Sequence, residues 1–143
     1  MSHDGLAEQA AIFEHLKTLA GGRVEEGWPD DAMHARYTED DTVKPYLTVE
    51  YFDPFPTEGD ATMTDGAADV PYVMPFTVAS TAGTRRHAVD LAAAARRRLI
   101  GFEPNGVLAG EVKGNGGSTS LPDRTARPSR FQVVSHFHVT INL

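Results

Sequence analysis

Cysteine is absent from this chain of 143 residues, which excludes disulfide bonds and metal sites built on thiolates. Long apolar runs are absent as well, and no segment approaches the roughly 18 apolar residues of a membrane span. The first residues, Met1 to Asp4, contain neither the basic nor the apolar region of a signal peptide. We therefore expect a soluble protein that is made in the cytoplasm and has no membrane partner.

Basic residues are scarce relative to acidic ones: 13 Lys and Arg stand against 20 Asp and Glu, for a net charge of −7. A nucleic-acid-binding protein usually carries a basic face. The one dense basic cluster in this sequence is Arg96-Arg97-Arg98, with Arg85-Arg86 one helix-length earlier. The balance argues against tight DNA binding, although an acidic surface lets DNA pass close by without sticking.

The apolar share of 41% is enough for one core, so we expect a single domain over residues 1–143. A first helix is predicted over residues 4–20, with Asp4 as its N-cap and Gly21-Gly22 as its end. Its apolar face is expected to combine one row, Leu6, Ala10, Phe13 and Lys17, with a second, Ile12, Leu16 and Leu19. A second helix begins after Thr84, and its stripe favours close packing on a sheet: Ala88, Leu91, Ala92, Ala95 and Leu99.

Alternating apolar residues predict strands over residues 23–26, 45–52, 71–81 and 131–143. Pro75 lies inside the third strand, which indicates an edge position or a bulge. The last strand is long for a domain of this size, and such a strand favours a shared edge in an assembly. The elements together predict an α+β fold, in which a mixed or antiparallel sheet is packed by two main helices.

Three segments with few aliphatic residues are expected to be long, mobile loop arms: residues 27–44, 53–70 and 113–130. Just before the third arm, Val107 to Val112 could form a short strand. The middle arm is acidic and carries Glu58, Asp60, Asp65 and Asp69. Because the two acidic arms, residues 27–44 and 53–70, lack the apolar content to fold alone, they are suited to ordering on neighbouring subunits.

His136 and His138 point to one face of the last strand, in a spacing that can bind zinc. No third ligand stands at a useful spacing, and the simpler interpretation is a polar strand face at a surface or interface. His138-Val139-Thr140-Ile141 also has the His-x-Thr-apolar form of two-histidine phosphoesterases, in which the histidines act as general acid and base. The second copy of that motif is missing from this sequence.

Arg96, Arg97 and Arg98 are expected in the last turn of the second helix, where cations are favourable. They are interpreted either as a solvated helix end or as partners of an acidic loop on the next subunit of a ring, with phosphate contact as a third option. Trp28 is expected to anchor its loop on the body of the protein or to make an aromatic contact at an interface. No acid–base pair or phosphate loop is present, so no enzyme activity and no cofactor are expected.

The order of these features resembles one known family. A helix ending in Gly21-Gly22 is followed by Arg23-Val24-Glu25-Glu26-Gly27-Trp28-Pro29 and later by Lys44-Pro45-Tyr46-Leu47-Thr48-Val49. The strand from Tyr72 to Thr81 then runs into Ala82-Gly83-Thr84-Arg85, an alanine- and arginine-rich helix and a terminal strand. Over most of its length the chain resembles the tail-terminator, or tail-completion, proteins of siphophages, particularly those of actinobacteriophages. Head-completion and stopper proteins of the same phage necks have a similar size and style, and they stay open as the alternative.

The resemblance implies a virion protein, assembled in the host cytoplasm, that forms a ring of six subunits at the head-proximal end of the tail tube. Such a ring ends polymerisation of the major tail tube protein and joins the tail to the head connector or stopper protein. Double-stranded DNA crosses the lumen without specific binding. Glu58, Asp60, Asp65 and Asp69 are then expected to face the lumen or an adjacent ring, where carboxylates repel DNA.

Overall fold

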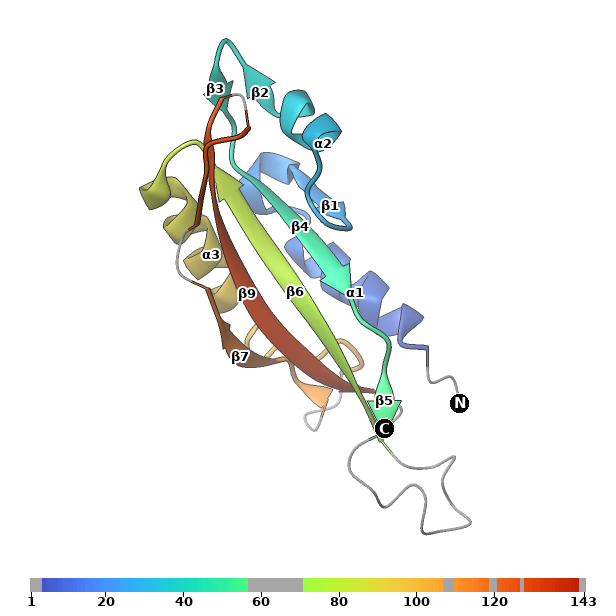
Figure 1. Cartoon of the computed structure of the whole chain (residues 1–143). Helices are drawn as coiled ribbons and strands as arrows, with labels where there is room; N and C mark the ends of the chain where they lie inside the picture. Colours follow the sequence, from blue (N-terminus) through green and yellow to red (C-terminus); the bar gives the residue numbers. More distant parts are fainter. Residues whose placement is uncertain (1–3, 57–70, 107–109, 119–120, 127, 142–143) are drawn as a thin grey trace.

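A computed structural model describes residues 4–56, 71–106, 110–118, 121–126 and 128–141. Its centre is a seven-stranded mixed sheet, shown in Figure 1. The main path runs through β1 (Val24–Glu26), β4 (Tyr46–Tyr51), β6 (Tyr72–Ala82), β9 (Arg130–Ile141) and β7 (Lys113–Gly117). Two short strands complete it: β5 (Phe55–Pro56) pairs with β6, and β8 (Leu121–Asp123) pairs with β9. Among the described strand pairs of this sheet, only β1 and β4 run parallel. The predicted α+β class with a mixed sheet is confirmed.

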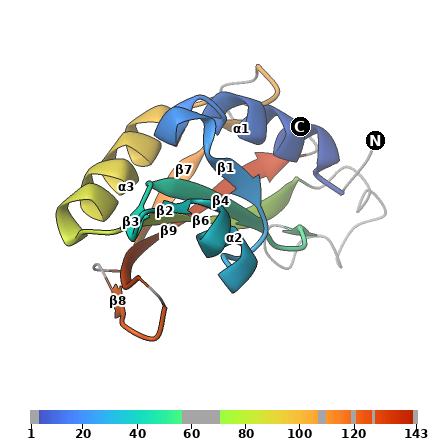
Figure 2. The same ribbon diagram turned by 90° about the horizontal axis from the view of Figure 1, so that it is seen from above.

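Two helices, α1 (Leu6–Leu16) and α3 (Arg85–Leu99), cover one face of this sheet, as Figure 2 shows. The predicted stripe of α3 is confirmed, because Ala88, Ala92, Ala95 and Leu99 are buried. The predicted N-cap is confirmed too, since the Thr84 hydroxyl accepts from the backbone N–H of His87 at 3.2 Å. Within the described residues, no helix is long and apolar enough to cross a membrane.

The start of α1 differs from the prediction. Its N-cap is Gly5, in the left-handed region at φ 72°, and not Asp4. Asp4 instead accepts a hydrogen bond from the backbone N–H of Leu6 at 3.0 Å. The buried row is Glu8, Ile12 and Leu16, whereas Leu6 is 62% exposed. Glu8 tolerates this position because Asn105 donates to its carboxylate at 2.6 Å. A short 3-10 helix, η1 (Leu19–Gly22), follows α1.

Residues 27–44, expected to be a loop, contain regular structure. They form a short helix, α2 (Asp31–Arg36), and a hairpin of two strands, β2 (Thr38–Glu39) and β3 (Thr42–Val43). Asp30 caps α2 by accepting from the N–H of Met33 at 2.8 Å. Met33 and Val43 are then buried against Tyr46 of β4. Two buried apolar side chains and one cap therefore help to order a segment whose composition is mostly polar.

Pro75 does not mark an edge strand, because β6 is central and pairs with β4 and β9. In an extended strand, the N and O atoms of one residue face the same neighbour. The carbonyl of Pro75 accepts from Phe52 N–H at 2.9 Å, so the proline nitrogen also faces the β4–β5 side. Pairing with β4 ends there at Tyr51–Phe76, and pairing with β5 resumes only at Phe55–Val73. The N–H group that proline lacks would thus lie where β6 is paired with neither β4 nor β5.

The last strand is not a shared edge. Residues 113–130, expected to be a loop, supply β7 and β8, which both pair with β9 on the side away from β6. The predicted strand near Val107 is absent from the described part of that segment, residues 110–112. In the middle arm, Phe55 and Pro56 pair with β6, and residues 57–70 lie outside the described residues.

Candidate functional site

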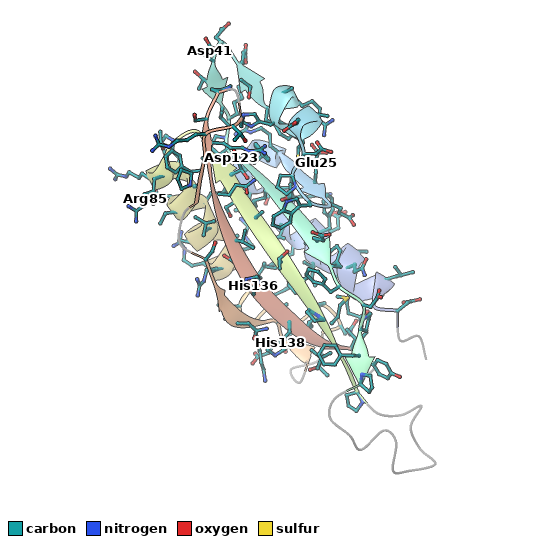
Figure 3. The ribbon with its side chains drawn as sticks, in the orientation of Figure 1. Glu25, Asp41, Arg85, Asp123, His136 and His138 are labelled. Carbon is teal, nitrogen blue, oxygen red and sulfur yellow. The ribbon has the colours of Figure 1, made fainter. Side chains whose placement is uncertain are left out.

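The sheet face opposite α1 and α3 carries the two predicted histidines. Residues directly opposite each other in an antiparallel pair share a face. Five pairs of β6 and β9 build this face: Val73–Thr140, Pro75–His138, Thr77–His136, Ala79–Val134 and Thr81–Gln132. Figure 3 labels His136 and His138 on it, and Figure 2 shows α2 on this side of the sheet. His136 is exposed and His138 is half-buried.

The described surroundings of these histidines consist of one polar partner, one nearby lysine and two residues of β6. His138 donates from Nδ1 to the side-chain oxygen of Asn115 at 2.7 Å. Burial lowers the pKa of His138, and the charge of Lys113 lowers it further. The residues opposite on β6 are Thr77 and Pro75, neither of which can ligate as an imidazole does. Among the described residues, no group of three or more His, Asp or Glu side chains is arranged to hold a metal ion.

A buried polar cluster lies at one end of this face, and sequence reasoning did not predict it. Arg130 Nε donates to Asp123 at 3.1 Å, and its NH1 donates to the hydroxyl of Tyr46 at 3.2 Å. The Tyr46 hydroxyl lies 3.4 Å from Nδ1 of His34, whose Nε2 donates to the carbonyl of Pro128 at 2.9 Å. Burial raises the pKa of Tyr46. The cluster joins α2 to the start of β9, so its role is structural.

Another ionic contact holds α2 on the first strand. Arg36 donates to both carboxylate oxygens of Glu25 at 2.6 and 2.7 Å, and the Tyr37 hydroxyl donates to the same carboxylate at 2.5 Å. The hydrogen bonds from Arg36 and then Tyr37 lower the pKa of Glu25. Sequence reasoning missed this pair because the two residues lie in different elements.

The predicted arginine cluster divides into two parts. Arg98 turns toward α1, where it donates to the carbonyl of His15 at 3.0 Å and to the hydroxyl of Thr18 at 2.8 Å. Arg96 and Arg97 instead line a groove of about 530 Å³ beside α3, together with Arg85. The remaining groove residues are small or apolar: Val89, Ala92, Ala93, Ser118 and Val133.

The β2–β3 hairpin carries the opposite charge. Its two turn residues, Asp40 and Asp41, have φ of 50° and 62°, in the left-handed region. Glu39 beside them pairs with Lys44 at 2.8 Å. Asp41 also lines a second hollow, which includes Thr84 and His87 at the start of α3.

Trp28 is the largest apolar side chain on the surface of the described residues. It is 51% exposed, whereas the neighbouring Pro29 is buried. Pro29, not Trp28, therefore anchors the loop between β1 and α2. The predicted acidic residues Glu58, Asp60, Asp65 and Asp69 lie outside the described residues.

No protein-family model and no curated protein matches the chain. A similar fold occurs in a solved chain from the virion of the native gene transfer agent (GTA) particle. The two share 16% sequence identity, with a TM-score of 0.55, and the match covers 92% of this chain and 92% of that chain. At this identity the likeness shows the fold alone.

Proposed function

We propose that the chain is a structural subunit of a phage-like virion. The observation that carries this proposal is the fold match over 92% of this chain and of a gene transfer agent virion chain. A match of that extent concerns the whole unit and not a common local motif. The surfaces of the chain are of a kind that subunit contacts use, namely an exposed tryptophan, a basic groove and an acidic hairpin tip.

Within the virion, the proposed role is that of a tail terminator. Six copies form a ring at the head-proximal end of the tail tube, where they stop polymerisation of the major tail tube protein. The other side of the ring receives the head connector or stopper protein. This finer assignment is supported by the order of sequence features around Gly21-Gly22, Trp28-Pro29 and Thr84. The role needs no catalytic residue and no cofactor.

Several side chains are proposed to contact neighbouring subunits or rings: Trp28, Arg96, Arg97, His136 and His138. Arg98 is already bonded within the subunit and contributes through the position of α3. Glu58, Asp60, Asp65 and Asp69 are proposed to face the lumen or an adjacent ring. Like charge then lets double-stranded DNA cross without specific binding.

Electron microscopy of the full chain mixed with the tail tube protein of the same virion tests the proposal. We expect tubes that carry a ring at one end and stop growing, whereas tube protein alone keeps elongating. Rings that bind the purified connector but leave tube ends bare would assign the chain to another neck position, as a head-completion or stopper protein. Stable monomers that bind zinc stoichiometrically would favour a histidine-based metal site instead.

A further inference from the structure

The groove beside α3 combines a basic rim with a floor of small residues. Arg85 and Arg96 stand about 16 Å apart along the helix, at about 1.5 Å per residue, and Arg97 lies next to Arg96. Between them, Val89, Ala92 and Ala93 line the groove on the helix side, and Val133 of β9 lines it on the sheet side. The groove therefore offers guanidinium groups on its rim, with long side chains that can turn inward, to a narrow acidic segment of little bulk.

The three arginines of the groove are unpaired within the described residues. Their guanidinium groups make no hydrogen bond and no ion pair there, whereas the side chain of Arg98, one residue further on, makes two hydrogen bonds. Arginine presents a planar fork of donors that matches a carboxylate. In a chain with a net charge of −7, such a group of free guanidinium ions is the surface most suited to an acidic partner.

The hairpin tip of the same protein offers that partner. Asp40 and Asp41 occupy the turn, and both carboxylates are without a partner among the described residues. The tip has a fixed base, because Val43 at the end of β3 is buried with Met33 and Tyr46. Figure 3 shows Asp41 at one extreme of the molecule and Arg85 pointing outward from α3.

The tip of a subunit does not occupy its own groove. Asp41 lines the separate hollow at the start of α3, which shares no residue with the arginine groove. A contact between the two surfaces therefore joins two copies. Because tip and groove are different patches, the contact is head-to-tail, and contacts of that kind close into rings when the rotation allows.

We propose that the Asp40–Asp41 tip of one subunit binds in the groove of the next subunit, against Arg85, Arg96 and Arg97. The inference rests on the proposed function only in that both require copies of this chain to assemble. It assigns the partner of the basic helix end to a described hairpin and gives the ring a direction.

Charge reversal tests the contact. A tip variant, D40R/D41R, and a groove variant, R85E/R96E/R97E, should each lose self-association roughly tenfold or more in sedimentation experiments, because each places like charges together. An equimolar mixture of the two should recover it, since a reversed tip can enter a reversed groove and an unchanged tip an unchanged groove. R86E, on the same helix but outside the groove, is the matched control and should associate normally. The proposal would be overturned if the reversed variants associated like the unchanged chain. It would also be overturned if the mixture did not associate although circular dichroism shows that both variants are folded.

Cross-linking gives a second measurement that does not depend on strong association. The chain has no cysteine, so D41C/A93C introduces the only two thiols. Oxidation should give a ladder of covalent oligomers, on tube ends or in concentrated solution. The control D41C/E14C, with its second thiol at an exposed position of α1 outside the groove, should stay monomeric. Equal ladders from both variants would contradict the assignment. A ladder from D41C/A93C without tube capping by the unchanged chain would leave the contact standing and remove the tail-terminator function.

Discussion

Arg130 is nearly buried, with 7% of its surface exposed, and its guanidinium keeps its charge at any pH that the protein meets. Removing such a charge from water is costly, and the cost is offset only where partners satisfy the donors. Asp123 supplies an ion pair at 3.1 Å and Tyr46 a hydrogen bond at 3.2 Å. The side chain of Asp123 is 31% exposed, so water reaches one member of the pair. The position of α2 and of the start of β9 depends on this balance.

Replacement of Asp123 by Asn should lower the free energy of unfolding by roughly 2 kcal/mol, because Arg130 keeps its buried charge without a counterion. The estimate is below the ~3–5 kcal/mol of a fully buried pair because Asp123 is partly hydrated. Denaturant unfolding measures the change. The control is Glu39→Gln, which breaks an exposed pair with Lys44 and should cost distinctly less, because water screens that pair. Equal costs for the two variants would show that burial of Arg130 does not matter.

At the scale of elements, the sequence predicts those helices and strands whose apolar residues recur at a regular spacing. The stripe of α3 and the alternation of β4, β6 and β9 appear in the structure within one or two residues of their expected bounds. In α1, the predicted burial of Ile12 and Leu16 is confirmed, whereas the burial of Glu8 was not predicted. A carboxylate counts as polar in any pattern, and its partner Asn105 is distant in the sequence. Pairings of that kind are set by the tertiary fold and leave no local signal.

Some residues of the candidate surfaces could likewise be predicted from the sequence, and others could not. The sequence identified Trp28, the arginine cluster and the two histidines, because their types are unusual at those positions. It did not separate Arg98 from Arg96 and Arg97, since only the packing of α3 against α1 decides which guanidinium is bonded. It also missed Asp40 and Asp41 as a hairpin tip, because the turn carries two aspartates where Asn-Gly would be the usual signal.

The strand β7 shows a tertiary contact overriding composition. Its sequence, Lys113 to Gly117, contains three glycines and reads as a loop, yet it pairs with β9. Gly117 explains part of this: a Cβ there would meet the carbonyl oxygen of Val134 in a severe clash and would lie 3.0 Å from the Cα of Ser135. The absence of a side chain lets the backbone of β7 approach β9 closely.

Gly117→Ala should therefore destabilise the chain by roughly 1–3 kcal/mol, because backbone atoms cannot move aside as a side chain can. Hydrogen exchange should show loss of protection at Ser118, whose N–H donates to Val134 at 2.8 Å. Gly114→Ala is the matched control on the same strand. Its new methyl group would meet only the side chain of Ile100, with Cδ1 at 3.2 Å, and this exposed side chain can rotate away. A larger loss from Gly114→Ala than from Gly117→Ala would refute this account of β7.

At the scale of the whole molecule, the residues that form the core differ from those proposed to bind other subunits. The main core lies between the sheet and the two long helices, and includes Phe76 and Phe137. Trp28 lies outside that core, on a loop that Pro29 already anchors. A large aromatic side chain left half in water contributes little to folding, and it is the residue type most often found at the energetic centre of interfaces. Stability and assembly should consequently respond to different substitutions.

Trp28→Ala separates the two properties. The free energy of unfolding of the isolated chain should change by less than about 0.5 kcal/mol, because half of the ring system is already hydrated. Capping of tail tubes should require roughly thirtyfold more protein, the equivalent of ~2 kcal/mol for an interfacial tryptophan. Leu6→Ala, at a side chain 62% exposed on α1, is the control and should alter neither property. If Trp28→Ala destabilised the monomer and left capping intact, Trp28 would be a loop anchor. If both substitutions weakened capping equally, the loss would reflect general surface apolarity and not a contact made by the loop that joins β1 to α2.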